Sequence, residues 1–126
     1  MSSVIYHSFI SDVLKGNIDV DSDTFYVMAS TNSYTENKDT HDRRDDVTNE
    51  ISGTGYTAGG NSVTVTVNAI DTTNDRVEIT LGGTTWPSST LTGVRKFAYY
   101  KRRGGASSAD ELVACIDKIG RASCRE

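Results

Sequence analysis

Apolar and polar residues alternate along a stretch in the middle of the chain. Valines occupy every second position over residues 63–67, with threonines between them, which is the two-residue period of a strand that buries one face. The alternation breaks at the turn-forming residues 71–75 and resumes over residues 77–81. The pattern predicts an antiparallel hairpin over residues 61–81. Its valine face requires a second layer, because a lone hairpin is barely stable in water.

The residues before this hairpin carry one helical pattern and one strand pattern. Between positions 4 and 14 the apolar side chains recur at helical spacing, so we expect a short amphipathic helix with Ser2 or Ser3 as its N-cap and a stop at Gly16. Residues 24–30 are rich in strand-forming side chains with apolar residues on both faces. This second pattern predicts an interior strand.

Further strands are predicted toward the C-terminus. Residues 84–86 indicate a short strand closed by Pro87, the single proline of the chain. Residues 94–101 and 112–117 carry the last two strand patterns. All the strands are short and polar turns separate them, which is typical of an antiparallel fold.

Two charged loops form the candidate interaction surface. Residues 32–50 consist mainly of charged and turn-forming residues, with one helical turn expected within 42–47, and residues 102–110 form a second exposed link. Long ordered loops often carry function. Charge reversal at an arginine of either loop should impair partner contact without unfolding the domain. The residues that we expect to make this contact are Asp39, His41, Asp42, Arg43, Arg44, Asp45, Asp46, Arg102 and Arg103.

Length and composition favour one mainly-β domain. The 126 residues include 36% hydrophobic side chains and many Thr, Ser, Asn, Asp and Gly, which is enough for one core between polar turns. We expect a single antiparallel β-sandwich or jelly-roll-like domain over residues 1–117, with one short N-terminal α-helix against a sheet edge or end. The side chains expected to be buried are Tyr6, Phe9, Ile10, Val27, Val65, Val67, Val77, Ile79, Phe97, Val113 and Ile116.

The charge and the cysteine count exclude several classes of function. A net charge of −4 disfavours nucleic acid or an anionic membrane as the main partner, despite the basic cluster within residues 95–103. Neither a secretion signal nor an apolar run long enough to span a membrane is visible. The two cysteines, Cys115 and Cys124, are too few for a disulfide scaffold, and Cys115 is expected to pack as a small apolar residue in a strand.

Three motifs could suggest a site, and each has a simpler structural interpretation. The alternating carboxylates of residues 19–23 open like a calcium loop, but the turn glycine and the closing glutamate are missing, so a solvated turn is favoured. His41 lies among acids without a second metal-ligand pattern, and the adjacent arginines favour ion pairing on a wet surface. The glycines of residues 53–60 match no phosphate-binding loop. We therefore expect no catalytic residues, metal or cofactor.

Several short segments of the chain carry a resemblance to known proteins. They are the helix pattern of residues 6–16, residues 18–21, 33–35 and 46–60, the turn Asn74-Asp75-Arg76, the pair Thr85-Trp86, and residues 99–101 and 114–117. Together they resemble a family of small structural proteins of tailed bacteriophages and prophages. The similarity covers residues 6–117 and implies a virion or virion-assembly component without catalytic residues.

The last nine residues depart from this resemblance. Residues 119–126 can be encoded by the start of a common sequencing-library adapter, and the adapter also supplies the end of a codon for Lys118. In the family, the final Ile-Asp pair is usually followed by Phe-Gly and further strands. We therefore expect Asp117 to be the last native residue, residues 118–126 to be a non-native tail, and the edge of the final strand to be open.

These observations favour a non-enzymatic structural or accessory protein of a phage particle, assembled in the bacterial cytoplasm and located in the virion. It would decorate the head or tail or form an assembly contact, with capsid or tail proteins or a second copy as partner. The alternative is a carbohydrate-binding module that contacts host glycans through exposed aromatic rings and the 39–50 loop. Its candidate rings are Tyr6, Tyr26, Tyr34, Tyr56, Tyr99, Tyr100 and Trp86.

Overall fold

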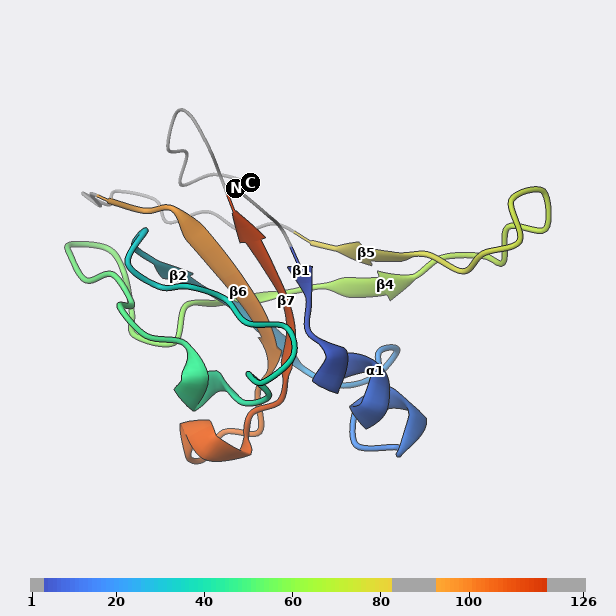
Figure 1. Ribbon diagram of the computed structural model, residues 1–126, viewed down its shortest axis with the longest axis horizontal. Helices are drawn as coiled ribbons and strands as arrows, with labels where there is room; N and C mark the ends of the chain where they lie inside the picture. The colour runs from blue at the N-terminus through green and yellow to red at the C-terminus, as the bar shows by residue number, and fades with distance from the viewer. Residues whose placement is uncertain (1–3, 83–92, 118–126) are drawn as a thin grey trace.

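The computed structural model describes residues 4–82 and 93–117. The main element is a five-stranded sheet of order β1-β7-β6-β2-β3, in which every neighbouring pair is antiparallel (Figure 1). The mainly-β, antiparallel class with one N-terminal helix is thus confirmed. The strands are β1 (Val4–Ile5), β2 (Phe25–Ser30), β3 (Asn61–Val63), β6 (Lys96–Lys101) and β7 (Leu112–Asp117).

The predicted hairpin is present, but most of it projects from the domain. Strands β4 (Val65–Val67) and β5 (Ile79–Leu81) pair with each other in a separate two-stranded sheet, and a bridge between Asp71 and Arg76 closes its tip. We call residues 65–81 the arm. Figure 1 shows the arm reaching past β7 and β1 to one side of the main sheet.

A single residue separates the arm from the main sheet. The predicted strand breaks at Thr64, because residues 61–63 pair with β2 whereas residues 65–67 pair with β5. The Gly82 amide donates to the Thr64 carbonyl at 2.7 Å, which holds the two ends of the arm together. Among the described residues, the second layer of strands is this hairpin, and the base of the hairpin packs on the main sheet.

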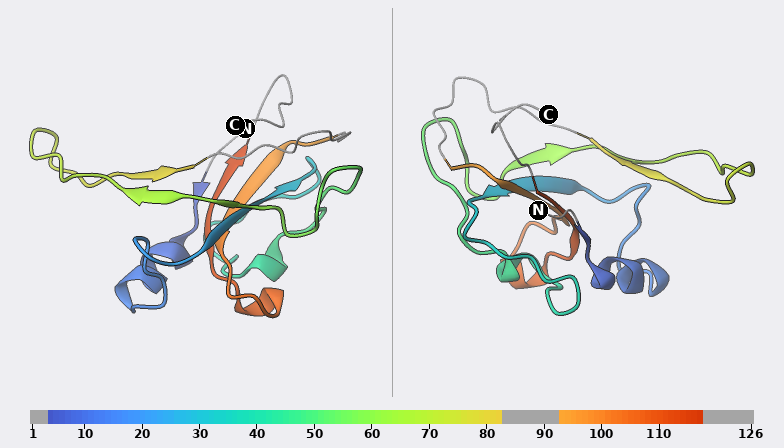
Figure 2. Two further views of the ribbon diagram at one scale, coloured as in Figure 1. Left: turned by 180° about the vertical axis from the view of Figure 1, so that it is seen from behind. Right: turned by 45° about the horizontal axis from the view of Figure 1, so that its top comes forward.

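The main sheet buries side chains on both faces. One face carries Phe25, Val27, Phe97 and Tyr99, which pack with α1 and the base of the arm. The other face carries Met28, Ala98, Tyr100 and Cys115, which pack with Tyr34 and Val47. Those last two residues belong to the 31–50 segment, so this polar-looking loop is the cover of the second face (Figure 2).

Five of the eleven predicted core residues are buried, three are half-buried and three are exposed. Tyr6, Phe9, Val27, Phe97 and Val113 are buried, whereas Val65, Ile79 and Ile116 are half-buried. The predictions for Ile10, Val67 and Val77 were wrong, since these side chains are 52%, 43% and 57% exposed. Ile10 lines a groove between α1 and the arm, and the two valines lie on the arm, where the sheet does not reach.

The predicted helix is α1 (His7–Leu14), and it is shorter than its apolar pattern. Its N-cap is Tyr6, without a side-chain cap, so the prediction of a serine cap was wrong; Val4–Ile5 instead form β1 against β7. The helix ends as predicted near Gly16, whose positive φ of 83° suits glycine. Strand β1 also occupies the outer edge of β7 beside Ala114 and Cys115.

The remaining predicted elements agree closely with the structure. Strand β2 lies inside the sheet between β6 and β3, and β7 has the predicted limits. The turn expected within residues 42–47 is the 3-10 helix η1 (Arg44–Asp46), and a second short helix, η2 (Ser107–Ala109), lies in the 102–110 loop. The predicted strand at 84–86, Trp86, Pro87 and the 118–126 tail fall outside the described residues.

Candidate interaction surfaces

The two predicted loops lie against each other. Helices η1 and η2 are in contact, and the Arg44 Nε donates to Oδ2 of Asp110 at 2.8 Å. The backbone repeats this link, because the Arg44 amide donates to the Asp110 carbonyl at 2.8 Å. The Asp110 side chain is only 1% exposed, so the pair is sealed inside the junction. Sequence analysis chose both loops but gave no sign that they meet.

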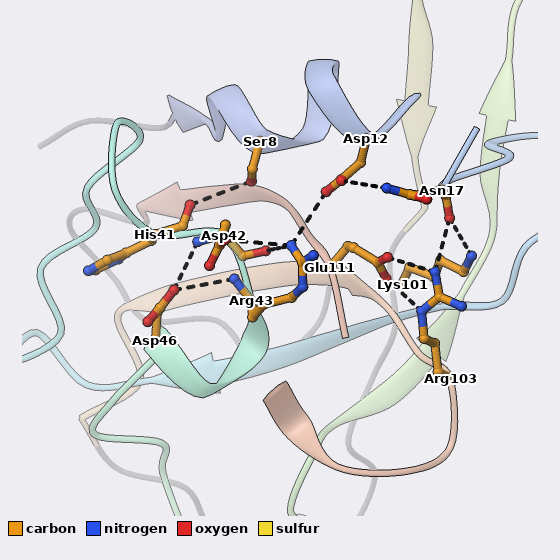
Figure 3. A network of polar contacts seen from close by, with 10 residues as sticks. All are labelled: Ser8, Asp12, Asn17, His41, Asp42, Arg43, Asp46, Lys101, Arg103 and Glu111. Carbon is orange, nitrogen blue, oxygen red and sulfur yellow. Dashed lines mark hydrogen bonds and ion pairs between the residues drawn. The ribbon is translucent and has the colours of Figure 1, made fainter. Parts of the chain in front are cut away.

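A polar network connects this junction to α1 (Figure 3). Arg43 Nη1 lies 3.7 Å from a carboxylate oxygen of Asp12 and 3.7 Å from one of Asp42. The Asp46 carboxylate accepts from the backbone amides of Asp42 and Arg43. Partial burial alone would raise the pKa of Asp46, but these two hydrogen bonds and further favourable contacts with His41 and Asp42 together outweigh it and hold the pKa below its ordinary value. The network therefore fixes the loop on the helix.

A second part of the network closes the base of the 102–110 loop. Arg103 donates from Nη2 and Nε to the two carboxylate oxygens of Glu111, at 2.6 and 2.9 Å. Arg103 and Lys101 also donate to the Asn17 carbonyl, and Lys101 pairs with Asp23 at 2.9 Å. These bonds hold the predicted solvated turn at residues 19–23 on the sheet.

The structure gives the nine predicted contact residues unequal surroundings. Arg43, Arg44 and Arg103 are engaged in the pairs described above, and the Arg102 guanidinium lies over the Tyr26 ring at 4.6 Å. His41 bonds to Tyr34, and Asp39 lies 3.1 Å from His7 Nδ1. The exposed members of this set are Asp39, Asp42, Asp45 and Arg103, although Arg103 also pairs with Glu111. Most of the predicted surface thus holds the domain together.

A buried chain of polar groups lies under the same loop, and sequence analysis missed it. The hydroxyls of Tyr6 and Tyr34 lie 2.7 Å apart, and the Tyr34 hydroxyl lies 3.0 Å from His41 Nδ1. Burial raises the pKa of both tyrosines, so both are neutral donors and acceptors at neutral pH. Beside them, Lys96 pairs with Glu36 at 2.6 Å in another nearly buried contact. These groups anchor the loop to the second face of the sheet.

The tyrosines do not form an exposed platform. Tyr6, Tyr34, Tyr99 and Tyr100 are buried, and Tyr56 is half-buried with its hydroxyl donating to Glu50. Tyr26 is half-buried between the Arg102 guanidinium and the Tyr100 ring. The six tyrosine rings are therefore engaged within the protein itself, whereas Trp86 lies outside the described residues, and glycan binding stays a prediction.

An apolar groove lies on the opposite side of the domain, between α1 and the arm. Its volume is about 550 Å³, and the turn after α1 closes one end. Val67 and Ile79, which are cross-strand partners in the arm, form one wall. The helix wall and the turn contribute Phe9, Ile10, Val13, Leu14, Ile18, Asp19, Val20 and Asp21. Sequence analysis missed this groove because it assigned four of its apolar side chains, Phe9, Ile10, Val67 and Ile79, to the core.

Residues 4–82 and 93–117 contain neither a candidate metal-binding cluster nor a candidate membrane-spanning helix. Over these residues, no three His, Cys, Asp or Glu side chains come together as a group that could hold a metal ion. Among the same residues, no helix has the length and apolar character needed to cross a membrane. Comparisons with models of protein families, with curated proteins and with solved structures found no match to this chain.

Proposed function

We propose that this chain is a non-enzymatic structural or accessory protein of a tailed-phage particle, where it decorates the head or tail or forms an assembly contact. The observation that carries the proposal is the arm, a hairpin that extends beyond the sheet with apolar side chains exposed to solvent. Val67, Ile70 and Val77 of the arm are 43%, 72% and 57% exposed. A partner in the particle would cover them.

The physical support for the proposal is the low stability expected of a two-stranded arm on its own. A two-stranded ribbon is marginally stable in water unless another surface packs on its apolar side. Monomeric proteins also rarely keep extended apolar patches open, and such patches commonly mark interaction sites. The arm and the adjacent helix together expose Ile10, Leu14 and the three arm residues. Binding to a partner removes this apolar surface from water and stabilises the ribbon.

The charged loops support the proposal in a different way from the one predicted. Their arginines pair mainly within the domain, so they make the fold rigid at the end that carries η1 and η2. A rigid domain with one projecting apolar element is suited to a fixed contact in an assembly, because little ordering is required on binding. We therefore place the main contact on the arm and its surroundings rather than on the loops.

The proposal is tested by mass spectrometry of purified particles from a host that carries the gene. We expect the chain in the particles, and we expect its incorporation to fall when residues 69–76 are replaced by an Asn-Gly turn. Replacement of exposed Asp45 by Asn serves as the matched control and should leave incorporation unchanged. Absence of the unaltered chain from the particles would overturn the proposal, as would normal incorporation of the shortened arm.

A further inference from the structure

The groove between α1 and the arm has the character of an incompletely covered core. Phe9 and Ile18 at its base are buried, whereas Leu14 and Ile10 at its opening are 82% and 52% exposed. Each large apolar side chain that remains in water forgoes the free energy that its burial would release. A segment that fills the groove would recover part of this free energy.

The charges around the groove are predominantly acidic. Asp19 and Asp21 line its end and are exposed. The arm beyond the groove carries Asp71, Asp75 and Glu78 against a single base, Arg76, and that base already lies 3.0 Å from Glu78. Lys15 follows the helix but does not line the groove. An occupant therefore meets an apolar centre between negative ends.

This charge pattern argues against a second copy of the chain as the occupant. The apolar side chains that a second copy could insert most easily are Ile70 and Val77 at the arm tip, and they lie among the acids of the arm. Inserting that tip would bring like charges together at Asp19 and Asp21. Such juxtaposition suppresses association and is a common device against wrong partners.

We propose that the groove binds an apolar segment of a different protein, flanked by Lys or Arg side chains. Its apolar side chains fill the space between Leu14 and Val67, in the manner of an amphipathic helix in a hydrophobic groove. Its cations approach Asp19 and Asp21, which speeds and orients the encounter. This inference rests on the proposed function in one respect only, since it makes the bound protein another component of the particle.

The test uses the purified chain and two synthetic amphipathic peptides. Both have leucines at the i, i+3, i+4 and i+7 positions; one carries lysines elsewhere, and the other carries glutamates. We expect the lysine peptide to bind and the glutamate peptide to bind at least about tenfold more weakly. Leu14→Gln should weaken lysine-peptide binding about tenfold, because it removes one apolar contact. Ile5→Gln, at an exposed apolar position outside both the groove and the arm, should leave binding unchanged.

Charge variants distinguish attraction of the peptide to Asp19 and Asp21 from its attraction to acidic side chains elsewhere on the domain. Asp19→Asn combined with Asp21→Asn should weaken binding and flatten its dependence on salt, whereas Asp45→Asn on η1 should not. Equal binding of the two peptides, or equal losses in Leu14→Gln and Ile5→Gln, would overturn the inference. A dimer that Leu14→Gln abolishes would overturn it too, because a second copy would then be the occupant. Particle incorporation is measured separately, so either proposal can fail while the other stands.

Discussion

The guanidinium of Arg44 lies 2.8 Å from the carboxylate of Asp110, although 66 residues separate them along the chain. Asp110 also accepts from the Arg103 amide at 2.9 Å, so its carboxylate is held on both oxygens inside the loop junction. A buried carboxylate is tolerated only with such partners. The junction between η1 and η2 therefore depends on this pair.

Replacing Arg44 by Gln should destabilise the domain by about 3 kcal/mol, because it leaves the buried Asp110 charge without its cation. This outcome departs from the sequence-based expectation that altering Arg44 leaves the fold intact. Arg76→Gln is the control: its partner Glu78 is 51% exposed, so the loss should be below about 1 kcal/mol. Urea unfolding measures both, and equal losses would contradict a structural role for Arg44.

Stability should fall in acid partly through Glu111. Burial alone would raise the pKa of Glu111, but the hydrogen bond from Arg103 and further favourable contacts outweigh it and hold the pKa below the ordinary value of 4.5. A lowered folded pKa means that the ionised group stabilises the fold above about pH 4.5, and that this stabilisation is lost as the pH falls through the folded pKa.

We expect Glu111→Gln to lower the Tm at neutral pH and to make the fall in Tm below about pH 4.5 shallower. Some slope should remain, because the pKa values of Asp23 and Asp46 are also lowered in the fold. Thermal unfolding by circular dichroism at a series of pH values measures the effect. Parallel curves for the two proteins would show that Glu111 contributes nothing to the acid transition.

Gly60→Ala should be among the most damaging single substitutions in the chain. Gly60 has φ of 82°, and a Cβ there would lie 1.8 Å from the Val27 carbonyl oxygen, so the β2–β3 pairing would have to shift. We expect a loss of more than about 2 kcal/mol. Gly104→Ala has a similar φ of 89° but open space, so it should cost about 1 kcal/mol. Chemical denaturation compares them, and similar costs would contradict the close approach.

The Tyr6–Tyr34 hydrogen bond should appear as an energetic coupling. Tyr34→Phe should destabilise the domain by about 1–2 kcal/mol, since it leaves polar groups of the buried chain without a partner. Tyr6→Phe together with Tyr34→Phe should cost less than the sum of the single changes, because both partners are then removed. Denaturant unfolding of the two single variants and the double variant completes this double-mutant cycle. Strict additivity would mean that the bond contributes no net stability.

Local pattern was enough to predict elements whose surroundings are uniform. Strand β7 is buried on both faces from Leu112 to Cys115, so its apolar run indicates where the strand lies. The break at Thr64 has no such signal, because valine and threonine alternate without interruption on both sides of it. The change of partner is determined by distant pairing, with β2 before Thr64 and β5 after it. Period alone cannot distinguish one long strand from two.

The interaction surfaces were less predictable for a related reason. Tyr34 and Val47 are single apolar residues in a charged loop, so no period indicates that they cover a sheet face. The apolar pattern of α1 correctly predicted a helix, but it did not show that only part of its apolar side would find cover. How far a second layer extends depends on the reach of the arm, which is a property of the whole fold.

The one-residue junction at Thr64 has a mechanical consequence. At this end only Thr64 separates the arm from the main sheet, because β3 ends at Val63 and β4 begins at Val65. Strand β3 is paired along its length with β2, which pairs in turn with β6. A pull on the arm tip is therefore transmitted along the backbone and loads the β2–β3 hydrogen bonds together rather than one at a time. The arm is therefore mechanically coupled to the main sheet.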